Sequence, residues 1–208
     1  MANITQGKIL QVLDWTYDKA INGVAGMDTA SELANSYSNE SQSKTECANT
    51  LIRWQNVKAG SSGFIAGVGG AITLPVVLPA NITSVLYIQV RMIAAIASMG
   101  GYDTKSDQVK TLVYACLTGN SAKDVLKGTG ISVGNKMASA TIKKIPGKVL
   151  TEINKKVGFR LVTKFGEKGV INLGKLVPLV GGFIGCAFDS ATTNTIGNVA
   201  RDLFILSE

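Results

Sequence analysis

A stretch of 44 residues, 59–102, contains a single charged side chain, that of Arg91, and this constrains the fold more than any other feature of the sequence. A run this apolar must be covered by other protein or by lipid, because large exposed hydrophobic patches are rare on soluble proteins. Pro75 and Pro79 interrupt it, and proline cannot continue the hydrogen bonding of a helix. We therefore predict an apolar helical hairpin that turns at these two prolines.

The two arms of this hairpin differ in whether they could span a bilayer. The first arm, residues 61–74, would be about 21 Å long as a helix, whereas the bilayer core is about 30 Å thick. The second arm, residues 81–99, is long enough to span, but a charge at its centre costs about 2.5–3.5 kcal/mol. Burial in a protein core is therefore favoured over full spanning, and shallow or conditional insertion stays open. The residues predicted for insertion are Phe64, Ile65, Leu74, Pro75 and Pro79.

Apolar residues at helical spacing predict helices in the remaining sequence. We expect helices over residues 6–25, 29–37 and 44–58, the last with Trp54 among its apolar positions. Thr104, three residues before Asp107, is predicted to cap a further helix. A shorter apolar hairpin is expected around Pro178. The predicted fold is all-α, a single-domain helical bundle with two Gly/Pro-punctuated apolar helical hairpins. Its expected segments are residues 1–58, 59–102, 103–175 and 176–208, within one domain.

The composition excludes several kinds of chemistry. The chain has no histidine, which rules out Ser-His-Asp triads, Cys-His dyads and histidine-ligated zinc. Its cysteines are odd in number and far apart, so we expect no disulfide framework and no metal site. We predict that Cys47, Cys116 and Cys186 are reduced and buried. The glycine runs lack the endings of phosphate-binding loops, so no cofactor is expected.

The positive charge is concentrated in one segment. Residues 123–175 contain 12 Lys and Arg against 3 Asp and Glu, a net charge of +9 in a chain whose total is +7. Phe159 and Phe165 are the only aromatic residues there and no nucleic-acid motif occurs, so nucleic acid is not expected as a partner. The charge favours anionic lipid headgroups, although a solvated face without a ligand stays open. The predicted headgroup-binding residues are Lys143, Lys144, Lys148, Lys155, Lys156 and Arg160.

Two charges stand alone in apolar sequence. Arg91 is one, and Asp189 is the only charge between Lys175 and Arg201. A buried charge is costly unless it is paired, so we predict that the two meet each other or a polar network between the hairpins. The other interpretation places each at a helix end in water. Tyr87, Gln89, Arg91 and Asp189 are the candidate polar groups of a pocket between the hairpins.

Short motifs occur in order along nearly the whole chain. They are Leu13-Asp14-Trp15, Ala30-x-x-Leu33-Ala34, Ser62-Gly63-Phe64-x-x-Gly67-x-Gly69-Gly70, Leu74-Pro75, Tyr87-Ile88-Gln89-x-Arg91, Gly101-Tyr102-Asp103 and Val177-Pro178-x-Val180-Gly181-Gly182-x-x-Gly185. Each is weak alone, but the ordered set resembles the EcsC family. Cys186 stands where another glycine is expected. The resemblance implies a bacterial, helical, membrane-associated protein and supplies no catalytic residues.

Together these observations favour a non-enzymatic protein over an enzyme. We expect a membrane-associated accessory or immunity-type protein that contacts anionic lipid or a membrane protein, without defining its oligomeric state. The N-terminus lacks a basic start followed by an apolar run, so a cytoplasmic protein at the inner face of the cell membrane is expected. The alternatives are an enzyme acting on a lipid or peptide, with a pocket between the hairpins, and a soluble protein-binding module.

Overall fold

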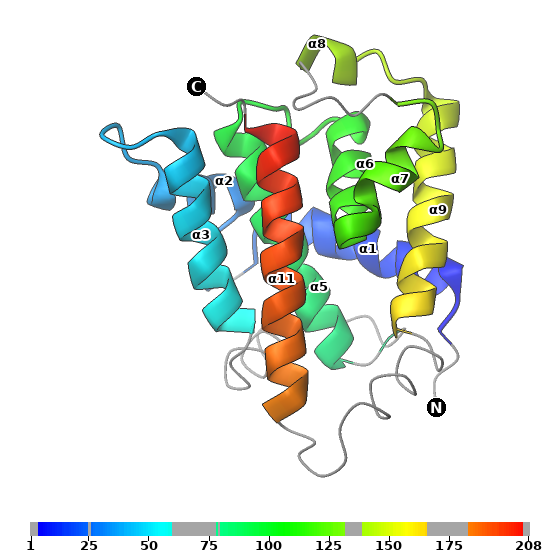
Figure 1. Cartoon of the computed structure of the whole chain (residues 1–208), viewed down its shortest axis with the longest axis horizontal. Coiled ribbons are helices and arrows are strands. Elements are labelled where there is room, and N and C mark those ends of the chain that lie inside the picture. Colours follow the sequence, from blue (N-terminus) through cyan, green and yellow to red (C-terminus); the bar gives the residue numbers. More distant parts are fainter. Residues whose placement is uncertain are drawn as a thin grey trace.

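The computed structural model describes residues 4–24, 26–59, 78, 80–131, 139–165 and 183–205. Within these ranges the chain is helical and forms no β-strand (Figure 1). This confirms the predicted all-α helical bundle. The first arms of both expected hairpins lie outside the described residues, and with them Phe64, Ile65, Leu74, Pro75 and Pro79.

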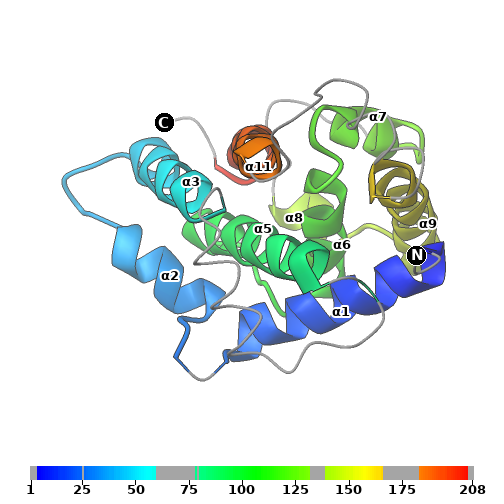
Figure 2. The same ribbon diagram turned by 90° about the horizontal axis from the view of Figure 1, so that it is seen from below.

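One apolar helix, α5 (Ala80–Met99), forms the centre of the bundle. Four helices pack around it: α1 (Gln6–Asn22), α2 (Ala30–Tyr37), α3 (Lys44–Ala59) and α11 (Phe183–Phe204) (Figure 2). Over Ile82–Met99, α5 is long and apolar enough to cross a membrane, but 89% of this window is buried inside the protein. The second arm of the predicted hairpin is therefore a core helix in this structure.

The remaining helices cover the other side of the bundle. α6 (Asp107–Cys116) packs on α5, and α9 (Gly147–Phe165) packs on both α1 and α6. Three short elements connect them: η1 (Gly119–Ser121), α7 (Ala122–Lys127) and α8 (Ser139–Ile142). Their buried side chains join one continuous hydrophobic core, as expected for a single domain of this size.

Side-chain caps explain why several helices begin where they do. Thr29 and Glu32 form a reciprocal capping box at the start of α2, with each side chain bonded to the backbone of the other. Ser43 and Glu46 repeat this arrangement at α3. The predicted Thr104 cap is wrong: α6 begins at Asp107, and the Ser106 hydroxyl accepts the hydrogen bond from the amide of Val109.

Four helix ends lie toward one end of the molecule, which we call the lower end. α3 and α9 stop there, and α5 and α11 begin there (Figures 1 and 2). Ala59, the last residue of α3, and Ala80, the first residue of α5, therefore both lie toward the lower end, and Leu78 is buried in the core. The opposite, upper end carries α8 and the beginning of α9.

Two of the three cysteines can be assigned. Cys47 and Cys116 are both free and buried, as predicted. Burial raises the pKa of the Cys116 thiol, which keeps it protonated and unreactive. The side chain of Cys186 lies outside the described residues.

Candidate functional site

The exposed large hydrophobic side chains among the described residues all lie near the lower end. They are Trp54 and Val57 on α3 and Phe159 on α9, with exposed fractions of 54%, 63% and 67%. Trp54 and Phe159 lie five and six residues before the last residues of their helices, or roughly 8 and 9 Å along the helix axis. α3 and α9 both end toward the lower end, on opposite sides of the bundle with α11 and α6 between them (Figure 2), and the core does not need these three exposed side chains.

Basic side chains accompany these three residues. Arg53 and Lys58 flank Trp54 and Val57 on α3, and Arg160 and Lys164 follow Phe159 on α9. Neither residues 53–58 nor residues 159–165 include an acidic side chain. We refer to this set as the lower-end surface. Its members are Arg53, Trp54, Val57, Lys58, Phe159, Arg160 and Lys164.

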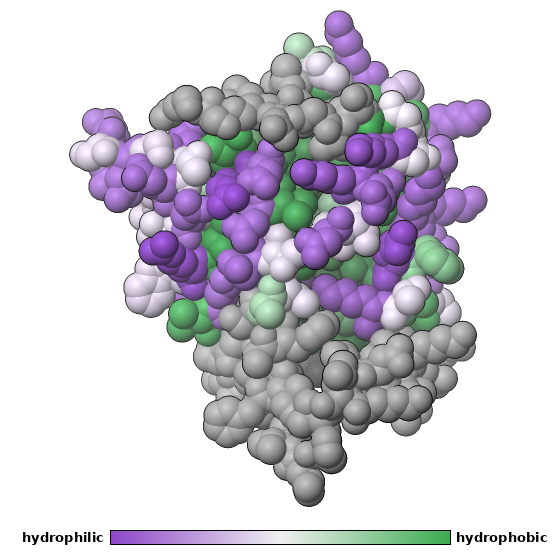
Figure 3. Space-filling view, viewed as in Figure 1, coloured by the Kyte–Doolittle hydropathy of each residue, from purple (hydrophilic) through white to green (hydrophobic). Residues whose placement is uncertain are grey.

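The surface of one face shows how charge and apolar area are distributed above the lower end. In Figure 3 the described part of the molecule is mostly hydrophilic, with only limited green patches between the purple side chains. Against such a polar exterior, the exposed Trp54 and Val57 side chains on α3 and the exposed Phe159 side chain on α9 are distinct features.

The six basic residues predicted from the sequence do not form one cluster. Lys143, Lys144 and Lys148 are exposed at the upper end, whereas Arg160 is exposed near the lower end. From Lys148 to Arg160 the helix rises roughly 18 Å. Lys155 is exposed between them. The structure thus spreads the predicted set from Lys143 and Lys144, between α8 and α9, along most of α9.

Lys156 differs from the other five residues because its ammonium group has partners within the protein. It donates a hydrogen bond to the backbone oxygen of Gly128 and lies 3.6 Å from the carboxylate of Glu152. Lys156 therefore ties α9 to the end of α7.

The polar groups predicted on α5 are buried. Tyr87, Gln89 and Arg91 are at most 3% exposed. The Gln89 amide donates a hydrogen bond of 3.0 Å to the Thr193 hydroxyl on α11. A polar contact between α5 and α11 therefore exists. Asp189 lies one turn before Thr193 on α11, and its side chain is outside the described residues.

Arg91 lies in the middle of α5 and inside the protein, so the interpretation that placed it at a helix end in water is wrong. Its Nη1 donates to the backbone oxygen of Asp28 at 3.3 Å, and its guanidinium carbon lies 5.4 Å from the centroid of the Tyr87 ring. Arg91 forms no ion pair with a carboxylate of the described residues. Its Nε has no hydrogen-bond partner.

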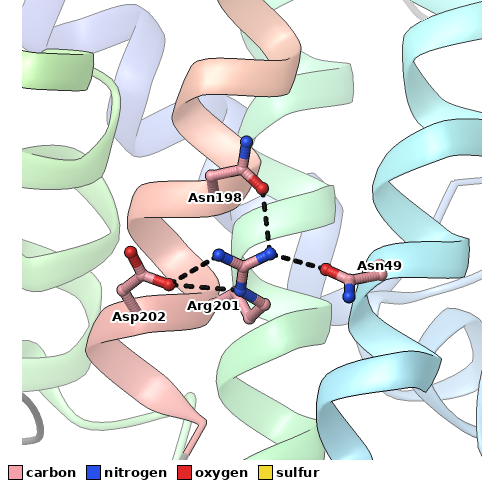
Figure 4. A network of polar contacts seen from close by, with 4 residues as sticks. All are labelled: Asn49, Asn198, Arg201 and Asp202. Carbon is pink, nitrogen blue, oxygen red and sulfur yellow. Dashed lines mark hydrogen bonds and ion pairs between the residues drawn. The ribbon is translucent and has the colours of Figure 1, made fainter.

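A second arginine shows how this bundle satisfies a guanidinium elsewhere. On α11, Arg201 donates to the side-chain oxygens of Asn49 and Asn198 at 2.6 and 3.1 Å, and to Asp202 at 2.8 and 3.1 Å (Figure 4). This network attaches α11 to α3 through Asn49. Arg201 has a paired charge and several partners, whereas the one acceptor of Arg91 among the described residues is a backbone oxygen.

Sequence reasoning missed two features of these regions. Trp54 was expected on the apolar face of its helix, yet it is exposed, because Cys47, Ala48, Leu51 and Ile52 already define the buried face. Gln55 is completely buried, and neither atom of its amide has a partner. A helical projection of residues 44–58 contains the first signal, since Trp54 and Val57 fall away from the centre of the buried face. The same projection places Gln55 at the centre of the buried face, four residues after Leu51 and three after Ile52, so the spacing also signals its burial.

No group of three or more potential metal-ligating side chains occurs within the described ranges.

Comparison with known proteins agrees with the order of motifs along the chain. No curated protein and no solved structure matches it. A model of the EcsC protein family matches residues 7–206, almost the full length of 208 residues. The chain therefore belongs to the EcsC protein family.

Proposed function

We propose that this chain is a peripheral membrane protein that docks on anionic lipid through its lower-end surface. The observation that carries the proposal is the exposure of Trp54, Val57 and Phe159 near the lower end, where the segments 53–58 and 159–165 contain basic residues and no acidic ones. Aromatic side chains beside lysine and arginine are typical of segments that lie at the boundary between headgroups and acyl chains.

The depth of the apolar residues fits such an attachment. Interfacial segments bury their apolar face about 5–10 Å into the headgroup and acyl boundary. Trp54 and Phe159 lie within roughly that distance of their helix ends. The bundle could therefore bring both side chains to lipid with its core helix α5 still buried in protein.

The energy available is enough for reversible attachment. A basic residue near an anionic membrane contributes about 1 kcal/mol, and full burial of a Phe side chain contributes about 1.5–3 kcal/mol. Stable anchoring requires two separate membrane-binding signals. The four basic side chains would supply one signal and the three apolar side chains the other. We expect the attachment to weaken with salt, because exposed charges are screened.

In this proposal the protein works without catalysis, at the inner face of a bacterial cell membrane. It serves there as an accessory to a membrane system, or as an immunity-type protein against a membrane-acting agent. The resemblance to EcsC proteins and the net charge of +7 support this setting. A soluble protein-binding module is the alternative that would use the same surface.

Vesicle co-sedimentation tests the proposal with two charge-matched variants. Removing Arg53 and Arg160 with Arg53→Ala and Arg160→Ala should weaken binding to anionic vesicles about 10–30-fold, equivalent to roughly 2 kcal/mol. Removing Lys143 and Lys144 at the upper end should leave binding within about twofold. Greater loss from the upper-end pair would assign docking to the other end of α9. A wild-type protein that stays in the supernatant would refute lipid docking and favour a protein partner.

A second candidate function, an enzyme acting on a lipid or peptide, is favoured by one observation only. Polar atoms of Tyr87, Gln89 and Arg91 are buried without partners. Buried orphan groups are common where a substrate completes the hydrogen bonding. This reading needs a turnover assay with phospholipid and peptide substrates, in which an Arg91→Met variant loses activity.

A further inference from the structure

The charge of Arg91 is poorly compensated for a residue that is 3% exposed. A buried guanidinium normally has a carboxylate or several acceptors, because the loss of hydration is large. Arg91 has a long hydrogen bond of 3.3 Å to a backbone oxygen and the face of the Tyr87 ring. The Arg201 network demonstrates that this bundle provides full pairing elsewhere.

Two further orphan groups lie on the same face of α5. Ser84, Tyr87 and Arg91 occur at positions i, i+3 and i+7, which share one side of a helix. Among the described residues, the buried hydroxyl oxygens of Ser84 and Tyr87 and the buried Nε of Arg91 have no hydrogen-bond partner outside this row, and, while burial raises the pKa of the Tyr87 hydroxyl, the Arg91 side chain acts to lower it. Native cores keep few such groups, so three of them in one row mark a place where a ligand would supply the missing hydrogen bonds.

The elements that face this row add charge to it. Asp28, just before α2, supplies the backbone acceptor of Arg91, while its side chain is exposed. Lys58, at the end of α3, has its pKa lowered by burial and by the positive charge of Arg91. Burial raises the pKa of Tyr87 and of Tyr37, and the charge of Arg91 opposes both changes. Two cations, Arg91 and Lys58, and the carboxylate of Asp28 thus lie near one row of hydroxyl donors.

We propose that the row Ser84, Tyr87 and Arg91 is a binding site for a phosphate group. Arginine forms two parallel hydrogen bonds with phosphate oxygens, and hydroxyl groups donate to the others. Such a ligand would neutralise the guanidinium and give the three orphan groups partners. The phosphate can belong to a soluble phosphate compound or to a phospholipid headgroup. The site goes beyond membrane docking, because its three residues lie on α5, and of the lower-end surface only Lys58 lies near it.

The first test is thermal unfolding of the full chain in chloride buffer, then with inorganic phosphate or with dihexanoyl phosphatidic acid below its micelle concentration. At about 100 times its Kd, a ligand of the native state should raise the Tm by roughly 5–10 °C. A response to the lipid alone identifies a headgroup, and a response to inorganic phosphate identifies a soluble compound. If neither probe raises the Tm of the wild type more than it raises the Tm of an Arg91→Met variant, the proposal is wrong.

Arg91→Met separates binding from a structural role. If Arg91 awaits a ligand, the variant should match or exceed the wild-type Tm in chloride, because an unpaired buried charge has gone, and it should lose the response to phosphate. A lower Tm with an unchanged response would show that Arg91 only supports the fold. Should this variant fail to fold, Tyr87→Phe keeps the packing and should reduce the phosphate affinity several-fold, whereas an unchanged affinity would contradict the site.

The two proposals fail separately. Arg53→Ala with Arg160→Ala should lose vesicle binding and keep the response to phosphate. Arg91→Met should keep vesicle binding and lose the response to phosphate. Loss of both properties in both variants would mean that one surface, and not two, carries them.

Discussion

The amide of Gln89 and the hydroxyl of Thr193 form a hydrogen bond of 3.0 Å that joins α5 to α11 inside the core. Both side chains are at most 1% exposed. Removing either partner leaves the other buried and unsatisfied, so Gln89→Met or Thr193→Val should each lower the free energy of unfolding by about 1–3 kcal/mol.

The double variant should recover part of this loss, because neither polar group then remains alone. Urea unfolding of the four proteins measures the coupling energy. Strict additivity of the two single effects would show that the bond contributes nothing to stability.

A second prediction concerns the packing of α11 on α3. A Cβ atom added at Gly197 would lie 2.7 Å from Cγ1 and 2.9 Å from Cγ2 of Ile52. These atoms are branched and buried, so they cannot move aside freely. Gly197→Ala should therefore destabilise the protein by about 1–3 kcal/mol.

Combining Gly197→Ala with Ile52→Ala makes room for the added methyl group. In the Ile52→Ala protein, Gly197→Ala should therefore no longer lower the stability. Gly147, where an added Cβ meets nothing within 4 Å, provides the control. Gly147→Ala should be neutral or stabilising. Equal effects of both alanine substitutions in thermal unfolding would contradict close packing at Gly197.

A third prediction is alkaline instability that depends on Tyr114. Burial and the neighbouring charge of Asp14 raise the pKa of Tyr114 above its ordinary value of about 10. The folded state thus keeps the Tyr114 phenol neutral. The contribution of this neutral phenol to the free energy of unfolding is complete below about pH 10 and is lost as the pH rises further. Tyr114→Phe should flatten the decline in the free energy of unfolding between pH 9 and 11.

Tyr114→Phe also removes the 3.0 Å hydrogen bond to Asp14, so its stability at pH 7 should be lower than that of the wild type. The slope, not the value at pH 7, decides the prediction. Parallel declines in the two proteins would show that Tyr114 does not control the alkaline limit.

A fourth prediction concerns the acid side. Hydrogen bonds from the backbone and the hydroxyl of Thr29 lower the pKa of Glu32. The ionised carboxylate is therefore stabilising above its unfolded pKa of about 4.3, and this contribution is lost as the pH falls through the lower folded value. The stability difference between the wild type and Glu32→Gln should be present at pH 7 and shrink below about pH 4.

Glu40 is exposed and makes no hydrogen bond among the described residues, so Glu40→Gln serves as the matched control. Its stability difference from the wild type should not change over the same range. Identical pH profiles of the two variants would contradict the role of the capping box.

Much of the fold could be predicted from the spacing of apolar residues. The expected helices over 6–25, 29–37 and 44–58 match α1, α2 and α3 closely, because their caps and apolar faces are local properties. The Thr104 cap was wrong because Ser106, two residues later, is the residue whose hydroxyl reaches an unpaired amide. Competition between neighbouring caps depends on where the helix packs.

The candidate sites were less predictable. Composition located the basic segment, but the direction of α9 in the bundle separates Lys143 from Arg160, and that direction is a tertiary property. The isolated charge of Arg91 correctly pointed to an unusual residue. Its surroundings on α2 and α3 come from distant parts of the chain, so spacing along the sequence could not define them.

The most direct test of membrane docking uses Trp54 as a fluorescent reporter. The chain has two tryptophans, and Trp15 packs partly buried against the core, so Trp15→Phe leaves Trp54 alone. Docking through the lower-end surface predicts a blue shift of Trp54 emission and quenching by brominated lipid on anionic vesicles, but not on neutral ones. Unchanged Trp54 emission in protein that sediments with anionic vesicles would contradict this surface as the site of docking.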